Sequence, residues 1–187
     1  MSDEAPILAP IDGALFRHTM SRYASGVTVV TVLDAEGHPW ALTANAISSV
    51  SLNPPLILVC IDKKANTYEA LTRASYFAVN FLEASEEELA LHFARHITDK
   101  FEAIPYEQGE TGAPLLPQAS IAMVECRMYA QYPGGDHTIV VGEVLSAKVS
   151  EGRPQIFYDR VFGTFAPNLP KKSAPAAEPD PWALDYF

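Results

Sequence analysis

The feature that most constrains the fold is a long uncharged stretch from Trp40 to Ile61, WALTANAISSVSLNPPLILVCI. Its first half mixes short hydroxyl and amide side chains with small apolar residues, and its second half is a continuous apolar run. Asn53-Pro54-Pro55 separates the halves and forces an extended backbone between them. We therefore expect a polar, tightly turning segment that leads into a buried strand from Leu56 to Ile61.

The polar half has the chemistry that a flat heteroaromatic ligand requires. Such a ligand presents neutral donors and acceptors along one edge, which hydroxyls, amides and backbone groups can bond. The side chains that would do so are Thr43, Asn45, Ser48, Ser49 and Ser51. The alternative is a serine-rich turn whose hydroxyls bond only the local backbone.

Two lysines follow this stretch at the start of a predicted short helix. Lys63 and Lys64 precede Asn66 and Thr67, either of which could cap that helix. Glu69, three residues after Asn66, has the spacing of a capping box. A helix start with nearby ammonium groups favours a bound anion such as a phosphate. The alternative is a capped surface helix with solvated lysines.

A second candidate is the glycine-rich turn from Pro133 to Asp136, followed by His137. An imidazole at the mouth of a barrel could face a ligand, and the glycines would let that ligand approach closely. The alternative is an ordinary hairpin turn between the strands expected at Ser120–Tyr132 and His137–Val149.

The rest of the chain predicts short strands and few helices. Further strands are expected at Gly26–Leu33, His38–Thr43, Tyr76–Leu82 and Gln155–Phe165. Helices are expected at Ile11–Ser25, from Asn66 or Thr67 to Arg73, and after a cap at Ser85. A loop is expected at Ile104–Pro117. Roughly six strands favour a mostly β fold, a closed antiparallel sheet with a few peripheral helices. The mouth of such a barrel holds one small ligand and is often completed by a second subunit.

The composition indicates one domain with distinct ends. The chain of 187 residues is long enough for one sizeable core. We expect a flexible N-terminal arm at 1–12, a folded domain at 13–165 and a tail at 166–187 that is rich in proline and alanine. The tail ends in Trp182, Leu184, Tyr186 and Phe187, which we expect to dock on the protein itself or on a partner.

Charge and hydropathy exclude several classes of partner. The net charge of −10 and the pI near 4.8 argue against nucleic acid and anionic membranes. The acidic N-terminus is not a signal peptide, and no apolar run is long enough to span a membrane. Cys60 and Cys126 are expected to be buried free thiols, which favours a cytoplasmic protein.

The usual catalytic motifs are absent. The sequence has no GxGxxG, GxxxxGK[ST] or GxSxG pattern. Glu88, His92 and His96 could share one helix face, but one ion cannot easily reach ligands two turns apart, so we expect no metal site. If the protein is an enzyme, the reactive chemistry belongs to a bound cofactor.

The order of the motifs resembles a known family. The chain resembles the flavin reductase domain, and more narrowly the small reductase component of two-component flavin monooxygenases. The motifs that carry the resemblance are, in order, GVTVVT, ALTANAISSVSLNPPLILVCIDKKANT, FAVNFL, LALHFA with DKF, GAPLLPQASIAMVEC and GGDHTIVVGEV. The resemblance runs from about Phe16 to Phe165. It implies a homodimeric split β-barrel that binds FMN or FAD, takes hydride from NADH or NADPH, and supplies reduced flavin to a partner monooxygenase.

The resemblance also implies roles for individual residues. The flavin ring and ribityl chain would be lined by Thr43, Asn45, Ala46, Ser48, Ser49 and Ser51, and the phosphate by Lys64, Asn66 and Thr67. Gly135, Asp136 and His137 would form the nicotinamide site, with His137 as the catalytic residue, and Arg160 would lie near the flavin. Hydride transfer between stacked rings needs no general base, which agrees with the missing triad. A non-enzymatic flavin carrier and an oxygenase that retains its flavin remain as alternatives.

Overall fold

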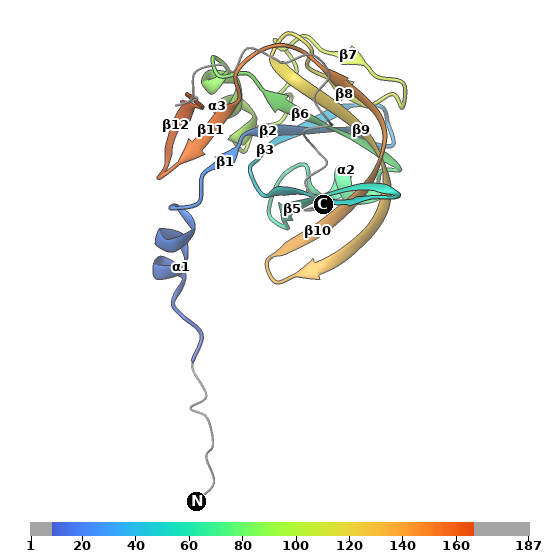
Figure 1. The fold of residues 1–187 in the computed structure, drawn as a ribbon. Helices are drawn as coiled ribbons and strands as arrows, with labels where there is room; N and C mark the ends of the chain where they lie inside the picture. The colour runs from blue at the N-terminus through green and yellow to red at the C-terminus, as the bar shows by residue number, and fades with distance from the viewer. Residues whose placement is uncertain (1–8, 167–187) are drawn as a thin grey trace, which may run out of the picture.

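The computed structural model describes residues 9–166, which form a strongly curved antiparallel sheet (Figure 1). Seven strands follow one another in space in the order β3-β2-β6-β9-β10-β5-β4. Their bounds are β2 Thr28–Leu33, β3 Pro39–Ala44, β4 Ile47–Leu52, β5 Pro55–Asp62, β6 Tyr76–Leu82, β9 Ser120–Gly134 and β10 His137–Val149. All pairings within this sheet are antiparallel.

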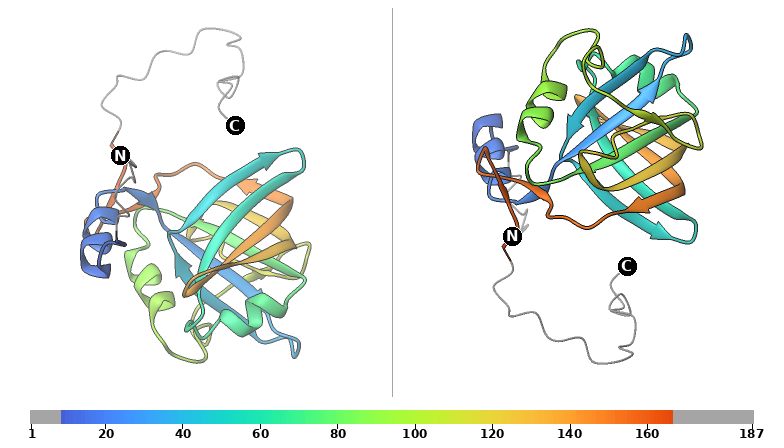
Figure 2. Two further views of the ribbon diagram at one scale, coloured as in Figure 1. Left: turned by 90° about the horizontal axis from the view of Figure 1, so that it is seen from below. Right: turned by 90° about the horizontal axis from the view of Figure 1, so that it is seen from above.

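The sheet curls until its two edges meet. The edge strands β3 and β4 are consecutive in the chain and are joined only by Asn45 and Ala46. At this junction the backbone N–H of Cys60 in β5 donates to the carbonyl of Ala46 at 2.9 Å. Figure 2 shows the resulting barrel from below and from above. The predicted mostly β, antiparallel barrel with peripheral helices is therefore confirmed.

Alternating side chains of strand β2 contribute to two of the three buried hydrophobic clusters in the described residues. Val30 and Val32 of β2 pack on one side with Phe77 and Val79 of β6. The adjacent residue Val29 points to the opposite face, where it belongs to a second cluster with Phe93 of the third helix. Because both faces of β2 are covered, five of its six residues are buried.

Three short helices and two small sheets surround the barrel. The helices are α1 Gly13–Met20, α2 Tyr68–Arg73 and α3 Glu87–Ala94. One small sheet contains β1 Ser25–Gly26, β11 Gln155–Tyr158 and β12 Val161–Thr164, and the other contains β7 Glu107–Gln108 and β8 Pro114–Leu115. Helix α1 begins after Asp12, whose carboxylate accepts the N–H groups of Ala14 and Leu15, each at 2.8 Å. None of its residues is buried.

The predicted polar turn is wrong in its conformation. Ile47–Leu52 is a strand that pairs along its length with β5, for example Ile47 with Val59 and Leu52 with Pro55. Turning is confined to Asn45-Ala46 before β4 and to Asn53-Pro54 after it. The serines give a poor strand signal by themselves, and the ladder with the apolar β5 fixes their conformation.

The predicted helix starts are only partly right. Thr67, one of the two expected caps, is the N-cap residue of α2, and the helix ends at Arg73 as expected, but the Thr67 side chain makes no capping bond and the expected capping box does not form. Helix α3 begins after Glu86, and Ser85 instead bonds the carboxylate of Glu83 through its N–H and hydroxyl. The acidic side chain of Glu83 is the stronger acceptor, so it holds Ser85 away from the helix start.

Three other expected elements differ from the structure. The first helix is shorter than Ile11–Ser25, Gln155–Phe165 is a hairpin of two strands, and Ile104–Pro117 contains the small β7–β8 pair. Most of the predicted arm at 1–12 and nearly all of the predicted tail at 166–187 lie outside the described residues.

Both cysteines are free thiols. Cys126 is buried, and burial raises the pKa of its thiol to about 12, whereas Cys60 is half-buried. No helix within residues 9–166 has the length and apolar character needed to cross a membrane. Helix α3 ends at Ala94, so His96 lies beyond it and the expected face of Glu88, His92 and His96 does not form.

Candidate functional site

Strand β4 presents small hydroxyl groups on the surface of the barrel. It is an edge strand, paired only with β5, and Ser48 and Ser49 are exposed while Ser51 is half-buried. The Ser48 hydroxyl donates to the Ser49 carbonyl at 3.0 Å, and the Ser51 hydroxyl accepts the Asn53 N–H at 3.2 Å. A hydroxyl offers one donor and two acceptor positions, so these groups keep bonding capacity for a ligand.

The residues at the junction of β3 and β4 continue this polar surface. Asn45 and Ala46 are exposed, and the Asn45 amide donates to the Ser25 hydroxyl at 3.2 Å. Thr43 is half-buried, and its hydroxyl donates to the carbonyl of Ala90 in α3 at 2.6 Å. Thr43 thus fastens the start of the polar surface to a helix, whereas Asn45 and Ala46 stay accessible.

The loop after β5 and the turn between β9 and β10 are joined by Lys63. Its backbone N–H donates to the carbonyl of Asp136 at 3.0 Å, and its ammonium group donates to the carbonyl of Gly135 at 2.5 Å. His137 pairs with Asp62 in the ladder between β10 and β5. The structure therefore brings together the two regions that the sequence indicated separately, the lysine-bearing loop and the glycine-rich turn.

The imidazole of His137 contacts the carboxylate of its neighbour Asp136. The His137 side chain is 41% exposed, and Nδ1 lies 2.7 Å from a carboxylate oxygen of Asp136. The bond from His137 and the charges of His137 and Lys64 lower the pKa of Asp136, which therefore stays ionised and holds the ring. Since Nδ1 is engaged by Asp136, Nε2 is the ring nitrogen that remains for a ligand.

The three predicted phosphate residues have different environments. Lys64 and Asn66 are exposed, and the Asn66 amide oxygen lies 3.4 Å from Nδ1 of His96. Thr67 is fully buried, and its hydroxyl donates to the Ala41 carbonyl at 2.8 Å. Helix α2 has only six residues, so the charge available to an anion here comes mainly from the lysines.

Arg160 lies on a different part of the fold. It forms the turn between β11 and β12 with Asp159, and both residues have positive φ, 65° and 47°. Asp159 accepts from Arg22 at 3.0 Å, which ties this turn to the end of α1. Within residues 9–166 no hydrogen bond or ion pair links Arg160 to Lys64 or His137.

Sequence reasoning missed three neighbours of the site. They are Ser25, which holds Asn45, His96, which lies beside Asn66, and Lys100, which is only 6% exposed. The Lys100 ammonium donates to the carbonyls of Phe93 at 2.7 Å and Ala41 at 3.0 Å, and burial lowers its pKa. These contacts join segments far apart in the chain, so no local pattern could have indicated them.

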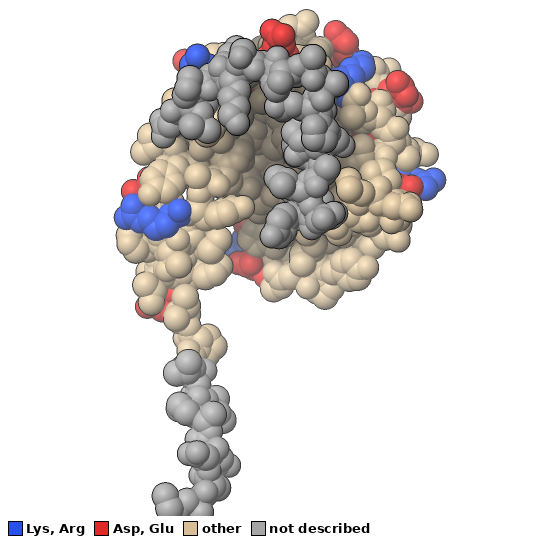
Figure 3. Space-filling model, in the orientation of Figure 1, with Lys and Arg blue, Asp and Glu red and all other residues tan. Residues whose placement is uncertain are grey.

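The polar surface is electrically neutral except near the lysines. Asn45, Ala46, Ser48, Ser49 and Ser51 carry no ionisable side chain, and the charged side chains that are visible in Figure 3 lie mainly near the margin of the view. Neutral hydroxyl and amide groups on one side and Lys64 on the other match a flavin, which has a neutral tricyclic ring and an anionic phosphate. The donor set therefore fits such a cofactor.

Comparison with known proteins gives the same class. The sequence model of the flavin reductase like domain matches residues 20–166. The chain is 41% identical over 170 residues to the NADH-dependent FAD reductase of Streptomyces globisporus, covering 88% of this chain and 92% of that protein. It is 39% identical to a probable flavin reductase of Rhizobium meliloti (strain 1021), covering 89% of this chain but only 52% of that relative. The chain thus spans about half the length of this second protein.

Solved structures agree with the sequence relatives. The Streptomyces globisporus C-1027 NADH:FAD oxidoreductase SgcE6 in complex with NAD and FAD fragments has a TM-score of 0.79 at 41% identity, covering 88% of this chain and 99% of that one. Flavin reductase PheA2 has a TM-score of 0.77 at 34% identity, covering 84% and 100%. The chain belongs to the flavin reductase like domain family. The predicted family, fold and enzyme class, a flavin reductase that uses a nicotinamide cofactor, are confirmed.

Proposed function

We propose that this protein transfers hydride from NADH to FMN or FAD and releases the reduced flavin to a partner monooxygenase. The observation that carries the proposal is the bonding of Lys63 to Gly135 and Asp136, which places the lysine-bearing loop against the His137 turn. Relatives named as NADH-dependent support NADH as the donor. A relative named as the reductase subunit HsaB of a flavin-dependent monooxygenase supports the partner.

The flavin is assigned to the exposed polar surface. Asn45 and Ala46 at the junction and Ser48, Ser49 and Ser51 on β4 hold the ring and ribityl chain through neutral hydrogen bonds. Lys64 and Asn66 hold the phosphate, and Thr43 and Thr67 support this surface from behind through their bonds to Ala90 and Ala41. When bound, the flavin supplies the hydride acceptor.

The nicotinamide is assigned to the turn that ends in His137. Gly135 has positive φ and open space at its Cα, so a ring can approach the backbone closely there. Asp136 contacts the imidazole through Nδ1 at 2.7 Å, which leaves Nε2 for the nicotinamide. The role of His137 is to orient the nicotinamide, because hydride transfer itself needs only two rings at close distance.

The enzyme is proposed to work as a homodimer. Helix α1 has no buried residue and exposes Leu15, Phe16 and Met20. On β4, Val50 and Leu52 are 50% and 74% exposed beside the polar serines. Large apolar side chains exposed on these two elements are the kind of surface that a second subunit can cover. Sedimentation at micromolar concentration should give twice the mass of the chain, and a monomer would contradict this part of the proposal.

The decisive experiment replaces His137. In His137→Ala, kcat/KM for NADH with saturating flavin should fall about 100-fold, while flavin affinity stays within a factor of two. His38→Ala removes an exposed histidine outside the site and serves as the matched control. Unaltered NADH oxidation in His137→Ala, with flavin still bound, would mean that the nicotinamide site lies elsewhere and would contradict the role assigned to His137.

The manner of flavin binding separates a reductase from a flavin-retaining oxygenase. A reductase that releases reduced flavin to another enzyme should bind flavin with micromolar affinity. The protein should therefore elute from gel filtration without bound, yellow flavin. A protein that stays yellow through the column would favour the oxygenase. A lack of flavin-dependent NADH oxidation in the native protein would end the proposal.

A further inference from the structure

His96 contacts the proposed phosphate residue Asn66 from a distant part of the chain. Its Nδ1 lies 3.4 Å from the amide oxygen of Asn66, although the two residues are 30 positions apart in the sequence. Within residues 9–166 no other group bonds the Asn66 amide. The function proposed above assigns no role to His96.

The contact decides which end of the Asn66 amide is left for a ligand. An amide oxygen can only accept a hydrogen bond, so Nδ1 of His96 is the donor in this pair. With its oxygen turned to His96, Asn66 keeps both N–H groups of its amide for another partner. N–H groups attract a phosphate, whereas an amide oxygen that faced the phosphate would repel it. The imidazole thus selects the amide orientation that an anion requires.

His96 is carried by a loop that is fastened on both sides. Just after α3, the N–H of Arg95 donates to the carbonyl of His92 at 3.2 Å. The His92 ring bonds the Lys100 carbonyl through Nε2 at 2.7 Å, which closes the loop around His96. The Lys100 ammonium also donates to the Phe93 carbonyl at 2.7 Å. Because several bonds hold this loop, the loss of one should leave His96 in place.

The loops that carry His96 and Asn66 meet at one backbone carbonyl. The carbonyl of Ala41 in β3 accepts the Thr67 hydroxyl at 2.8 Å and the Lys100 ammonium at 3.0 Å. Thr67 adjoins Asn66 in the chain, and Lys100 closes the loop of His96. Thr67 is fully buried and Lys100 is 6% exposed, so both bonds lie in the interior. The barrel itself therefore places the two loops side by side.

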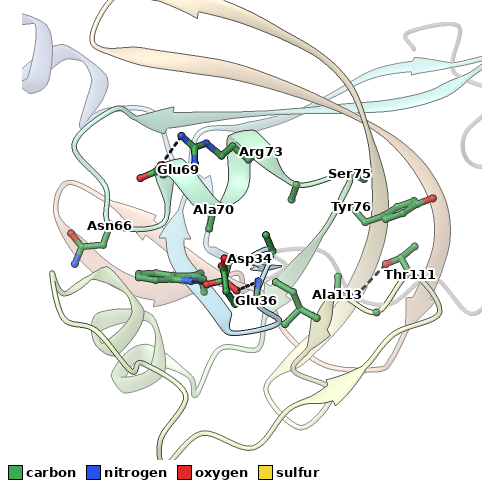
Figure 4. A pocket seen from close by; sticks show the side chains of 15 residues that line it. Asp34, Glu36, Asn66, Glu69, Ala70, Arg73, Ser75, Tyr76, Thr111 and Ala113 are labelled. Carbon is green, nitrogen blue, oxygen red and sulfur yellow. Dashed lines mark hydrogen bonds and ion pairs between the residues drawn. The ribbon is translucent and has the colours of Figure 1, made fainter.

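The neighbouring carboxylates do not engage the Asn66 amide. Glu69, three residues after Asn66, bonds Arg73 at 2.8 Å along α2. Figure 4 shows this pair on the helix and Asn66 apart from it, at one end of the cavity alongside α2. Asp62, which precedes the loop, accepts the N–H of Lys64 at 2.9 Å. The amide is therefore left to the imidazole and to a ligand.

We propose that His96 is a positioning residue of the phosphate site, which holds the Asn66 amide with its N–H groups towards the flavin phosphate. His96 acts through Asn66 and does not itself touch the phosphate. Hydrogen bonds at enzyme sites commonly tighten when the ligand binds, so a distance of 3.4 Å is compatible with this role. The inference rests on the proposed function, because it takes the flavin phosphate to lie at Lys64 and Asn66.

The test compares FMN with riboflavin, which has no phosphate, in variants of His96. In titrations by flavin fluorescence, His96→Ala should bind FMN about fivefold more weakly, with riboflavin changed less than about twofold. His96→Asn places an amide N–H near the position of Nδ1 and should keep FMN affinity within about twofold of the native value. His38→Ala, which removes an exposed histidine between β2 and β3, is the matched control. Equal losses for both ligands in His96→Ala would indicate a merely structural role and overturn the inference.

A double-mutant cycle separates an action through Asn66 from a direct contact with the phosphate. Asn66→Ala should weaken FMN binding about tenfold, and adding His96→Ala should weaken it no further, because the imidazole then has no amide to hold. Additive losses would mean that His96 contacts the phosphate itself, and would overturn the positioning role.

The outcomes also separate this inference from the proposed function. If the native protein binds FMN no more tightly than riboflavin, the phosphate site is wrong and the inference falls with it. If Lys64→Ala and Asn66→Ala weaken FMN binding while His96→Ala does not, the inference alone is overturned. Hydride transfer is tested by NADH oxidation and does not enter these titrations.

Discussion

Buried and exposed charged side chains of this protein differ in how many hydrogen bonds the protein itself makes to them. Lys100 and Glu125 are 6% and 2% exposed, and each is bonded by groups of its own chain. Lys100 donates to two carbonyls, and Glu125 accepts the N–H groups of Glu110 and Thr111 and the Thr111 hydroxyl. Lys64, by contrast, is exposed, and no side-chain bond or ion pair engages its ammonium within residues 9–166.

The difference shows which charges serve the fold and which serve a ligand. A buried ion must have its hydrogen bonds satisfied by the protein, because its hydration is lost. An exposed lysine pays no such cost and contributes little to stability. Lys64 therefore remains available for an external anion, whereas Lys100, although it is also a lysine beside a helix end, does not.

Replacing Lys100 should give the largest effect. Lys100→Met keeps the apolar stem but removes two charged hydrogen bonds and leaves the Phe93 carbonyl without that donor, so we expect a loss of about 3 kcal/mol in unfolding free energy. Urea denaturation measures it, and Arg17→Met on the exposed helix α1 is the control. Flavin affinity of the folded fraction should be nearly unchanged. A stable Lys100→Met variant with weak flavin binding would show that this buried lysine serves the ligand and not the fold.

Glu125 should make stability depend on acid pH. Burial raises its pKa, but the hydrogen bonds from Thr111 and Glu110 outweigh burial and the net pKa lies below the ordinary 4.5. A lowered pKa contributes stability above about pH 4.5 that is lost as the pH falls below it. We expect Glu125→Gln to cost about 2 kcal/mol at pH 7 and less at pH 3, measured by urea denaturation at both values. A constant difference would contradict this.

Replacing Lys64 should affect binding and not folding. Lys64→Ala should weaken FMN binding about tenfold, or about 1.4 kcal/mol, and leave riboflavin binding unchanged because riboflavin has no phosphate. The melting temperature should stay the same. Lys148→Ala, another exposed lysine, is the control. Equal losses for both ligands would show that Lys64 supports the ring site and not the phosphate.

Replacing Arg160 should give the smallest effect of these substitutions. Its φ of 65° is a left-handed conformation that glycine adopts without cost, so Arg160→Gly should stabilise the fold by about 1 kcal/mol. Asp159→Gly is the comparison that also removes the bonds to Arg22 and Ser21. Flavin titration of Arg160→Gly tests its predicted role, since weaker binding would require this strained residue to reach the cofactor.

The sequence predicted the strands better than the site. Tyr76–Leu82 and His137–Val149 agree residue for residue with β6 and β10, because apolar alternation and flanking turns are local signals. Strand β4 was missed since its serines favour turns and only the pairing with β5 extends them. The lysine loop and the His137 turn were each indicated, but their contact is a bond between residues 63 and 135, which no local pattern encodes.

The closure of the barrel also has a kinetic consequence. Asn45 and Ala46 join the two edge strands β3 and β4, which lie at opposite ends of the strand order and are not paired as neighbours in the sheet, and Ala46 is held by the bond from Cys60 of β5. Amide protons at this lip should exchange with deuterium much sooner than those of the central strands β6 and β9. If the flavin binds at this junction as proposed, local opening there would let it exchange while the central strands stay paired.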